Sequence, residues 1–238
     1  MSTAPIVLVP GFWLGAWAWD EVATLLRADG HDVTALTLPG RGSPDADRSA
    51  VTLADHVDAI AEAVRSAGAP VVLALHSGAG VSGYGASDLV AEHLAAVVYV
   101  DSGPATGAID EEFSLAEMPL PSWDELTADG TSLDGLGPGH LEEFRARAVP
   151  EPGSSLREAP TLTHDARLDV PTTVICTSMT AEQLQGWVAQ GSEIVGGLAE
   201  LRDVTYVDLS TSHWPMWSRP QETAAIIGGL ATAHAPRG

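Results

Sequence analysis

The middle of the chain contains the stretch Val71-Val72-Leu73-Ala74-Leu75-His76-Ser77-Gly78-Ala79-Gly80-Val81. It opens with five apolar residues, as is typical of a strand buried on both faces of a parallel sheet. Ser77 and three small residues follow, and the sequence then continues as a helix. A strand, a tight turn and a helix in this order hold a serine hydroxyl clear of the sheet edge, with helix amides aimed at it. The stretch therefore predicts an α/β fold and a candidate nucleophile, Ser77.

Ser77 lies in an imperfect match to Gly-x-Ser-x-Gly, the pattern of a nucleophile elbow. The positions two before and two after the serine hold Leu75 and Ala79. Alanine is a mild change, whereas Leu75 beside a tight turn is expected to crowd the neighbouring strand or helix. An ordinary Ser-Gly turn after a buried strand is the alternative interpretation.

Apolar runs alternate with helical segments along the whole chain. The runs cover residues 5–9, 32–37, 70–75, 96–100, 171–177 and 204–209. Residues 19–29 have helical periodicity and stop at Gly30, and residues 53–67 follow Thr52, a good helix N-cap. Such alternation predicts a single domain, residues 1–238, with a doubly wound, mostly parallel six-stranded sheet and helices on both faces.

Residues 104–167 interrupt this alternation, and we call them the lid segment. They are rich in Pro, Gly and acidic residues, with only short helical pieces such as 140–148. A long insertion of this kind in a compact domain is usually a lid or a binding loop. Apolar side chains would form its inner face: Met118, Leu120, Trp123, Leu126, Leu133, Leu136 and Phe144. A poorly ordered surface excursion is the alternative.

His213 is the candidate general base. It follows a strand-like run that ends near Leu209, and it stands in a small polar loop before Pro215 and a final helix. A base has to reach the serine from a loop at the carboxyl edge of the sheet, where this loop is expected. A solvated loop histidine is the alternative. His76, beside Ser77, is expected to support the site, and Asp208 in the last strand is expected to be structural.

The acid that would orient His213 has three interpretations. Asp101 follows the run 96–100 and is the favoured candidate, although an aspartate there also commonly caps the next turn. Glu182 is the first carboxylate after the run 171–177. The third interpretation is that the site has no acid.

The two motifs, with Ser77 before His213 in the chain, resemble those of the α/β-hydrolase superfamily. The resemblance covers nearly the whole chain. The opening stretch 7–19 is similar to the small methyl-salicylate esterase and hydroxynitrile lyase group and its bacterial relatives, with Pro10-Gly11 where those typically have His-Gly. The resemblance implies an oxyanion hole made by the backbone N–H groups of Phe12 and Gly78. It also implies an acid after the run 171–177, where this chain has none before Glu182.

Four aromatic residues are candidates for substrate binding, with core packing as the alternative for each. They are Trp13, Tyr84, Trp123 and Trp214. An apolar lid and these rings favour a hydrophobic small-molecule substrate.

The charge balance argues against several partners. All 11 basic residues are Arg, against 32 Asp plus Glu, which gives a formal net charge of −21. Such a surface repels phosphate backbones and anionic lipids, so we expect neither nucleic acid nor membrane partners. The missing Lys favours a GC-rich bacterial genome over adaptation to salt. The sequence leaves the oligomeric state open, a homodimer included.

Location and cofactors follow from other absences in the sequence. No signal-peptide pattern opens the chain and no apolar run is long enough for a membrane span, so we expect a cytoplasmic protein. The histidines show no metal-ligand spacing, and Cys176, in an apolar run, is expected to be buried and inert. We therefore expect neither a metal nor another cofactor.

The favoured function is hydrolysis of an ester, thioester or lactone through an acyl-enzyme on Ser77. A lyase or cyclase that uses His213 as acid and base is the first alternative, because the elbow is altered and the usual acid is missing. A catalytically silent binding protein is the second. These readings rest on fold-level analogy for the chemistry.

Overall fold

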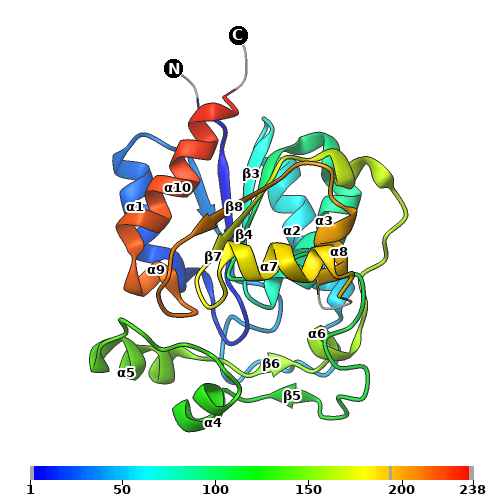
Figure 1. The fold of residues 1–238 in the computed structure, drawn as a ribbon. Helices are drawn as coiled ribbons and strands as arrows, with labels where there is room; N and C mark the ends of the chain where they lie inside the picture. The colour runs from blue at the N-terminus through cyan, green and yellow to red at the C-terminus, as the bar shows by residue number, and fades with distance from the viewer. Residues whose placement is uncertain (1–2, 193–194, 236–238) are drawn as a thin grey trace.

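A computed structural model describes residues 3–192 and 195–235 (Figure 1). Its centre is a parallel sheet with the strand order β2-β1-β3-β4-β7-β8. The strands are β1 (Ile6–Val9), β2 (Val33–Ala35), β3 (Val71–His76), β4 (Leu94–Val100), β7 (Thr172–Cys176) and β8 (Val204–Asp208). Each of the six apolar runs overlaps one of these strands, which confirms the predicted sheet. The run 32–37 is the least complete match, because its strand ends at Ala35.

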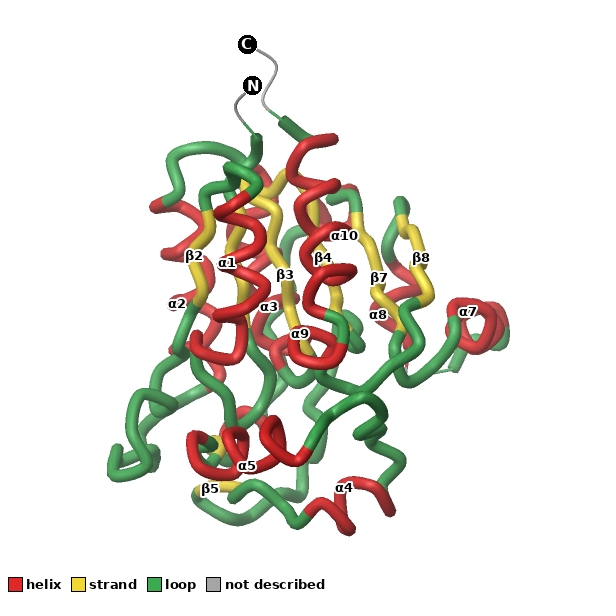
Figure 2. The backbone as a smooth tube through the Cα atoms, turned by 90° about the vertical axis from the view of Figure 1, so that its left-hand side faces the viewer, coloured by secondary structure: helices red, strands yellow, loops and turns green. Residues whose placement is uncertain are grey.

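Helices cover both faces of the sheet. Figure 2 shows α1 (Asp20–Ala28), α9 (Pro215–Ser218) and α10 (Pro220–Ala233) in front of the strands. The opposite face packs against α2 (Leu53–Ser66), α3 (Ala79–Val90), α7 (Ala181–Ala189) and α8 (Gly196–Glu200). The doubly wound arrangement is therefore as predicted.

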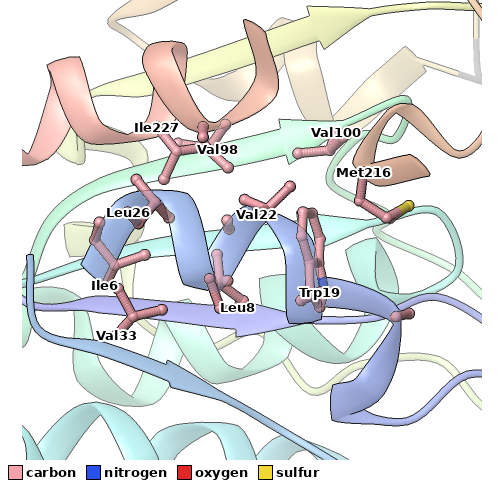
Figure 3. Close-up of a cluster of buried hydrophobic side chains, with 14 of the residues drawn as sticks. Ile6, Leu8, Trp19, Val22, Leu26, Val33, Val98, Val100, Met216 and Ile227 are labelled. Atoms are coloured by element: carbon pink, nitrogen blue, oxygen red, sulfur yellow. The ribbon is translucent and has the colours of Figure 1, made fainter. Parts of the chain in front are cut away.

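Alternate side chains of the four central strands, β1, β3, β4 and β7, face different helix layers. In β1, Ile6 and Leu8 point to the layer of α1 and α10, together with Trp19 and Leu26 (Figure 3). Val7 and Val9 of the same strand point to the other layer. This two-sided burial explains why the strands read as continuous apolar runs rather than as alternating patterns.

The predicted helix boundaries have local causes. Thr52 Oγ1 accepts a hydrogen bond from the backbone N–H of Asp55, and the Asp55 carboxylate accepts one from the N–H of Thr52. This reciprocal capping box starts α2, and Gly68 follows the helix with φ of 72°. Three short 3-10 turns also occur, namely η1 (Ala16–Trp19), η2 (Ala91–His93) and η3 (Asp165–Asp169).

The helices and strands of the lid segment lie beyond the carboxyl ends of the sheet strands, at the bottom of the view in Figure 1. It contains β5 (Glu117–Met118), β6 (Glu151–Pro152), α4 (Trp123–Ala128), α5 (Pro138–Arg147) and α6 (Ser154–Arg157). Strands β5 and β6 pair with each other in antiparallel fashion. The expected helix 140–148 is α5, which begins two residues earlier because Pro138 stands in its first turn.

Hydrogen bonds attach the lid segment to two loops at the carboxyl edge of the sheet. The Trp13 indole N–H donates to the carbonyl of Met118 over 3.1 Å. The backbone N–H of His213 donates to the carbonyl of Ser132 over 2.9 Å. Within residues 3–192 and 195–235, no helix is long and apolar enough to cross a membrane.

Candidate active site

Ser77 occupies the sharp turn between β3 and α3. Its φ of 51° lies in the left-handed region, which is unfavourable for a residue with a side chain. The Ser77 N–H donates to the carbonyl of Val100 on the neighbouring strand over 3.2 Å. The strain and the anchor together hold the hydroxyl at the carboxyl edge of the sheet.

Leu75 fits beside this turn because the facing helix has a glycine at the point of contact. A Cβ placed on Gly83 of α3 would collide with both methyl groups of Leu75, and with its Cγ at 2.8 Å. The expected crowding is therefore real, and it is relieved by a missing side chain on α3. The elbow keeps its shape with Leu75 in place of a small residue.

His213 connects Ser77 with Asp101 through its two ring nitrogens. Its Nε2 lies 2.7 Å from Ser77 Oγ, and its Nδ1 lies 2.6 Å from Oδ2 of Asp101. An ionised carboxylate only accepts hydrogen bonds, so Nδ1 carries the proton and Nε2 is free to accept the serine hydroxyl proton. Glu182, the other candidate acid, is exposed on α7 and is not the partner of this imidazole.

Asp101 follows β4 and is built to remain ionised. Burial raises its pKa, but the hydrogen bond and charge of His213 together with the Ser178 hydroxyl and N–H bring the pKa well below its usual value. The other oxygen, Oδ1, accepts the backbone N–H groups of Thr177 and Ser178 over 3.1 and 2.9 Å. Asp101 thus also caps the turn after the neighbouring strand β7, rather than the turn that follows it in the chain.

His76 supports the turn on the other side of Ser77. Its Nδ1 accepts the N–H of Gly11 over 3.2 Å, and its Nε2 donates to the carbonyl of His213 over 2.8 Å. Burial, and then the nearby His213, lower the pKa of His76 to about 3. The ring is therefore neutral and ties the Gly11 turn to the His213 loop.

Two backbone N–H groups beside Ser77 are those predicted to form the oxyanion hole. Among residues 3–192 and 195–235, the N–H groups of Phe12 and Gly78 donate to no protein acceptor. A Cβ on Gly11 would lie 2.7 Å from Ser77 Cβ, which shows how closely this turn approaches the serine. A Cβ on Gly78 would collide with the Phe12 ring. The two turns are therefore in contact next to the hydroxyl.

A cavity of about 350 Å³ lies beside the histidine and the aspartate. Its wall is mainly apolar, and the lid segment contributes Pro104, Ala105, Asp129, Gly130 and Thr131. The apolar wall includes Pro104, Ile175, Met179, Leu184, Val195 and Leu198. The cavity borders His213 and Asp101 but does not border Ser77 itself.

None of the four aromatic residues expected to bind substrate lines this cavity. The interpretation of Tyr84 is wrong, since its ring is buried on α3 under the guanidinium of Arg167 and its hydroxyl pairs with Glu200. Trp214 is also buried and meets the His213 ring edge-on, with 5.0 Å between ring centres, so it supports the imidazole from behind.

The other two aromatic candidates serve the lid segment. Trp13 is buried next to Phe12 and anchors Met118. Trp123 packs on Phe144, and the guanidinium of Arg145 lies 4.2 Å from its ring centre. Both rings pack within the lid segment or between the lid segment and the core.

Two remaining sequence expectations concern Cys176 and Asp208. Cys176 is buried, as expected, although it borders the cavity beside His213, and burial raises the pKa of its thiol to about 11, which disfavours the reactive thiolate. Asp208 ends β8, and its Oδ1 accepts the N–H of Ala181 at the start of α7. Asp208 therefore has structural surroundings, as expected.

Sequence reasoning missed a buried ion pair close to the site. Arg41 and Glu151 meet at 2.7 Å with almost fully buried side chains. They are 110 residues apart, so no local pattern could have paired them. No group of three or more potential metal ligands occurs within residues 3–192 and 195–235.

Comparison with known proteins places this site in a wider context. Residues 6–226 match a family model described as the alpha/beta hydrolase family. Esterase PIR7B of Oryza sativa subsp. japonica is 25% identical over 98% of this chain and 97% of that protein. Methylesterase 7 of Arabidopsis thaliana is 37% identical, but the match spans only 40% of this chain and 38% of that relative.

Solved structures show the same fold at lower sequence identity. An extracellular alpha/beta-hydrolase from a Paenibacillus species superimposes with a TM-score of 0.74 at 19% identity, covering 98% of this chain and 100% of that one. Tomato methylketone synthase I gives 0.73 at 17% identity, covering 98% and 99%. Esterase PIR7B and Methylesterase 7 are both plant proteins. The bacterial origin of this chain therefore stays a prediction, and its cytoplasmic location stays one as well.

Proposed function

The chain belongs to the alpha/beta hydrolase family, and we propose that it is a serine esterase that cleaves small hydrophobic esters through an acyl-enzyme on Ser77. The observation that carries the proposal is the continuous hydrogen bonding from Asp101 through His213 to the Ser77 hydroxyl. Thioesters and lactones require the same chemistry and belong to the proposed substrate class.

In the first half of the reaction, Ser77 Oγ attacks the ester carbonyl while His213 Nε2 takes the hydroxyl proton. Asp101 stays ionised because its pKa is low, and it stabilises the imidazolium that forms. The tetrahedral intermediate then collapses, the carbon–oxygen bond to the alcohol breaks, and His213 returns its proton to the leaving oxygen. The products of this half are an alcohol and the acyl-enzyme.

In the second half, a water molecule replaces the alcohol. His213 removes a proton from the water as it attacks the acyl carbonyl, and then returns the proton to Ser77 as the acid leaves. The amides of Phe12 and Gly78 would hold the oxyanion in both halves, and each such donor is worth about 3 kcal/mol elsewhere. The start of α3 adds a favourable dipole at the same place.

The cavity beside His213 is the proposed site for the hydrophobic part of the substrate. Its volume of about 350 Å³ is at the lower end of the range for small-molecule sites. Asp101 and Asp129 border it, and the chain carries a net charge of −21, so anionic substrates are disfavoured. We therefore propose an uncharged ester with a compact apolar group.

The two features that favoured a lyase or cyclase, the altered elbow and the missing usual acid, are compatible with hydrolysis in this arrangement. Gly83 makes room for Leu75, so the altered elbow remains compatible with an exposed serine. Asp101 stands where the imidazole needs a carboxylate, although it follows a different strand from the usual acid. Both observations support hydrolysis.

Labelling with a fluorophosphonate probe tests the proposal. The wild-type protein should react at Ser77, the variant Ser77→Ala should not, and a burst of p-nitrophenol should accompany acylation by p-nitrophenyl esters. Ser87→Ala is the matched control, because Ser87 is a buried serine on α3 whose hydroxyl binds the Tyr84 carbonyl. A folded wild-type protein that takes no label and shows no burst would overturn the proposal.

A further inference from the structure

The buried pair Arg41–Glu151 grips the turn that precedes Trp13. Arg41 Nη1 donates to the carbonyls of Pro10 and Gly11 over 3.1 and 2.9 Å, while its Nη2 binds Glu151 Oε1. The second oxygen of Glu151 accepts the N–H of Trp13 over 3.4 Å. Two buried charges are expensive unless their remaining hydrogen-bonding capacity is used, and here much of it is used on one stretch of backbone.

We propose that Arg41 and Glu151 are positioning residues that aim the Phe12 N–H at the oxyanion. This inference rests on the proposed hydrolase function and adds to it the device that orients one of the two amides. It also assigns a role to the lid segment, because Glu151 belongs to β6 of that segment.

The geometry of the peptide bond determines where the Phe12 N–H points. In a trans peptide the C=O and the N–H of one unit point in opposite directions, and the described chain contains no cis peptide bond. The Gly11 carbonyl and the Phe12 N–H share one peptide unit. When Arg41 binds the Gly11 carbonyl, the Phe12 N–H is therefore turned away from Arg41 and held there.

The peptide units on either side are held as well. In the unit before, Arg41 binds the Pro10 carbonyl while His76 Nδ1 accepts the Gly11 N–H. In the unit after, the Trp13 N–H points to Glu151. Three consecutive units are thus fixed, and the Phe12 N–H is the one amide of the three that donates to no acceptor within residues 3–192 and 195–235.

Trp13 shows that this conformation needs support from outside the turn. Its φ of 65° is unfavourable for a bulky residue. Its N–H binds Glu151, and its carbonyl accepts the N–H of Val149 over 3.0 Å, so the lid segment holds the strained residue on both sides. Loss of the Glu151 charge would leave Arg41 as a buried cation without its counter-ion and would loosen this support.

The consequence for catalysis is specific. An amide that contacts the developing oxyanion stabilises the transition state more than the bound substrate, so its misplacement lowers kcat more than it changes KM. Glu151→Gln keeps the shape and one acceptor oxygen but removes the charge. We expect its kcat for p-nitrophenyl acetate to fall 10- to 100-fold with KM within twofold of wild type, and a boronic acid inhibitor to bind more weakly by a similar factor.

Asp88→Asn is the matched control. Asp88 forms another buried ion pair, with Arg167, and it borders neither Ser77 nor the cavity beside His213. This variant should lose thermal stability like Glu151→Gln but keep the wild-type kcat. Arg41→Lys is the second variant, since one ammonium keeps the charge but cannot reproduce the fork that reaches two carbonyls and a carboxylate.

Hydrogen exchange separates this inference from the proposed function. The amides of Gly11 and Trp13 should exchange faster in Glu151→Gln than in wild type, whether or not the protein hydrolyses esters. A wild-type protein without esterase activity would count against the proposed function alone. A folded Glu151→Gln variant with unchanged protection at those two amides, or an active one with wild-type kcat, would overturn the positioning role.

Discussion

The Nδ1 atom of His213 lies 2.6 Å from Oδ2 of Asp101, a carboxylate that follows β4 rather than β7. These two strands are neighbours in the sheet, so side chains from either end reach the same imidazole. Asp101 has a φ of 43° and binds the two backbone N–H groups that follow β7. The carboxylate is thus supplied by β4, the strand beside β7. It is hydrogen-bonded to the loop after β7, which is where the resemblance to the hydrolases implies an acid.

Asp101→Asn is expected to lower kcat for p-nitrophenyl esters by about 10⁴-fold. The amide no longer compensates the imidazolium, and its NH₂ favours the wrong histidine tautomer. Steady-state kinetics at neutral pH measure the effect, with circular dichroism as a check of folding. Glu182→Gln is the control, because this exposed side chain should be dispensable. A larger loss in Glu182→Gln than in Asp101→Asn would reverse the assignment.

Gly83→Ala is expected to destabilise the protein by about 1–3 kcal/mol, the usual result of overpacking a core. The new methyl group would overlap Leu75, which is fully buried and has no room to move. In the double variant Leu75→Ala/Gly83→Ala, the added methyl should be tolerated better than in wild type. Urea unfolding of all four proteins gives the coupling energy, and additive effects would show that the two positions do not conflict.

The stability of the fold should fall as the pH is lowered from about 6.5 towards 4, in part because of His56. Burial, followed by the charge of Arg41, lowers the pKa of His56 from 6.5 to about 4. The unfolded chain therefore binds one more proton than the folded chain in this window, and stability present above pH 6.5 is lost on acidification.

His56→Gln should reduce that slope by up to about 1.4 kcal/mol per pH unit, the contribution of one proton. The free energy of unfolding in urea, measured between pH 4.5 and 7, gives the slope. The same substitution at the exposed His93 controls for the loss of an imidazole. Parallel curves for wild type and His56→Gln would contradict the burial argument.

Met179→Trp should narrow the cavity beside His213 and discriminate between substrates by size. Met179 lies in the loop after β7 and is only partly buried, so a larger side chain there does not strain the core. We expect kcat/KM for p-nitrophenyl octanoate to fall at least 10-fold, with less than a twofold change for the acetate. An equal loss for both esters would show that acyl chains do not enter this cavity.

Much of the fold was predictable because its four central strands are buried on both faces. The apolar runs located all six strands. Ser77 and His213 were each expected after a strand, at the same edge of the sheet, and they meet there. Asp101 could be favoured because its strand was expected to end at that edge. The fit of Leu75 could not be foreseen, because it depends on which residue of α3 faces the strand.

The errors have a common physical origin in side-chain direction. Tyr84 lies two helical turns beyond Ser77, and its position in the sequence does not reveal that it faces Arg167 instead of the cavity. The same limit hid Arg41 and Glu151, whose pairing depends on how the lid segment folds back over the core. Spacing along the chain predicts which strand end a residue occupies, and tertiary packing decides where its side chain points.

The bond from the His213 amide to the Ser132 carbonyl bears on attempts to redesign the enzyme. Trimming residues 104–167 to admit bulkier molecules would remove the acceptor that steadies the histidine loop, along with the counter-ion of Arg41. A variant with a shortened lid segment would therefore lose contacts that hold the His213 loop and the turn bound by Arg41. Enlarging the cavity at Met179 or Leu198, which line it outside the lid segment, leaves both attachments intact.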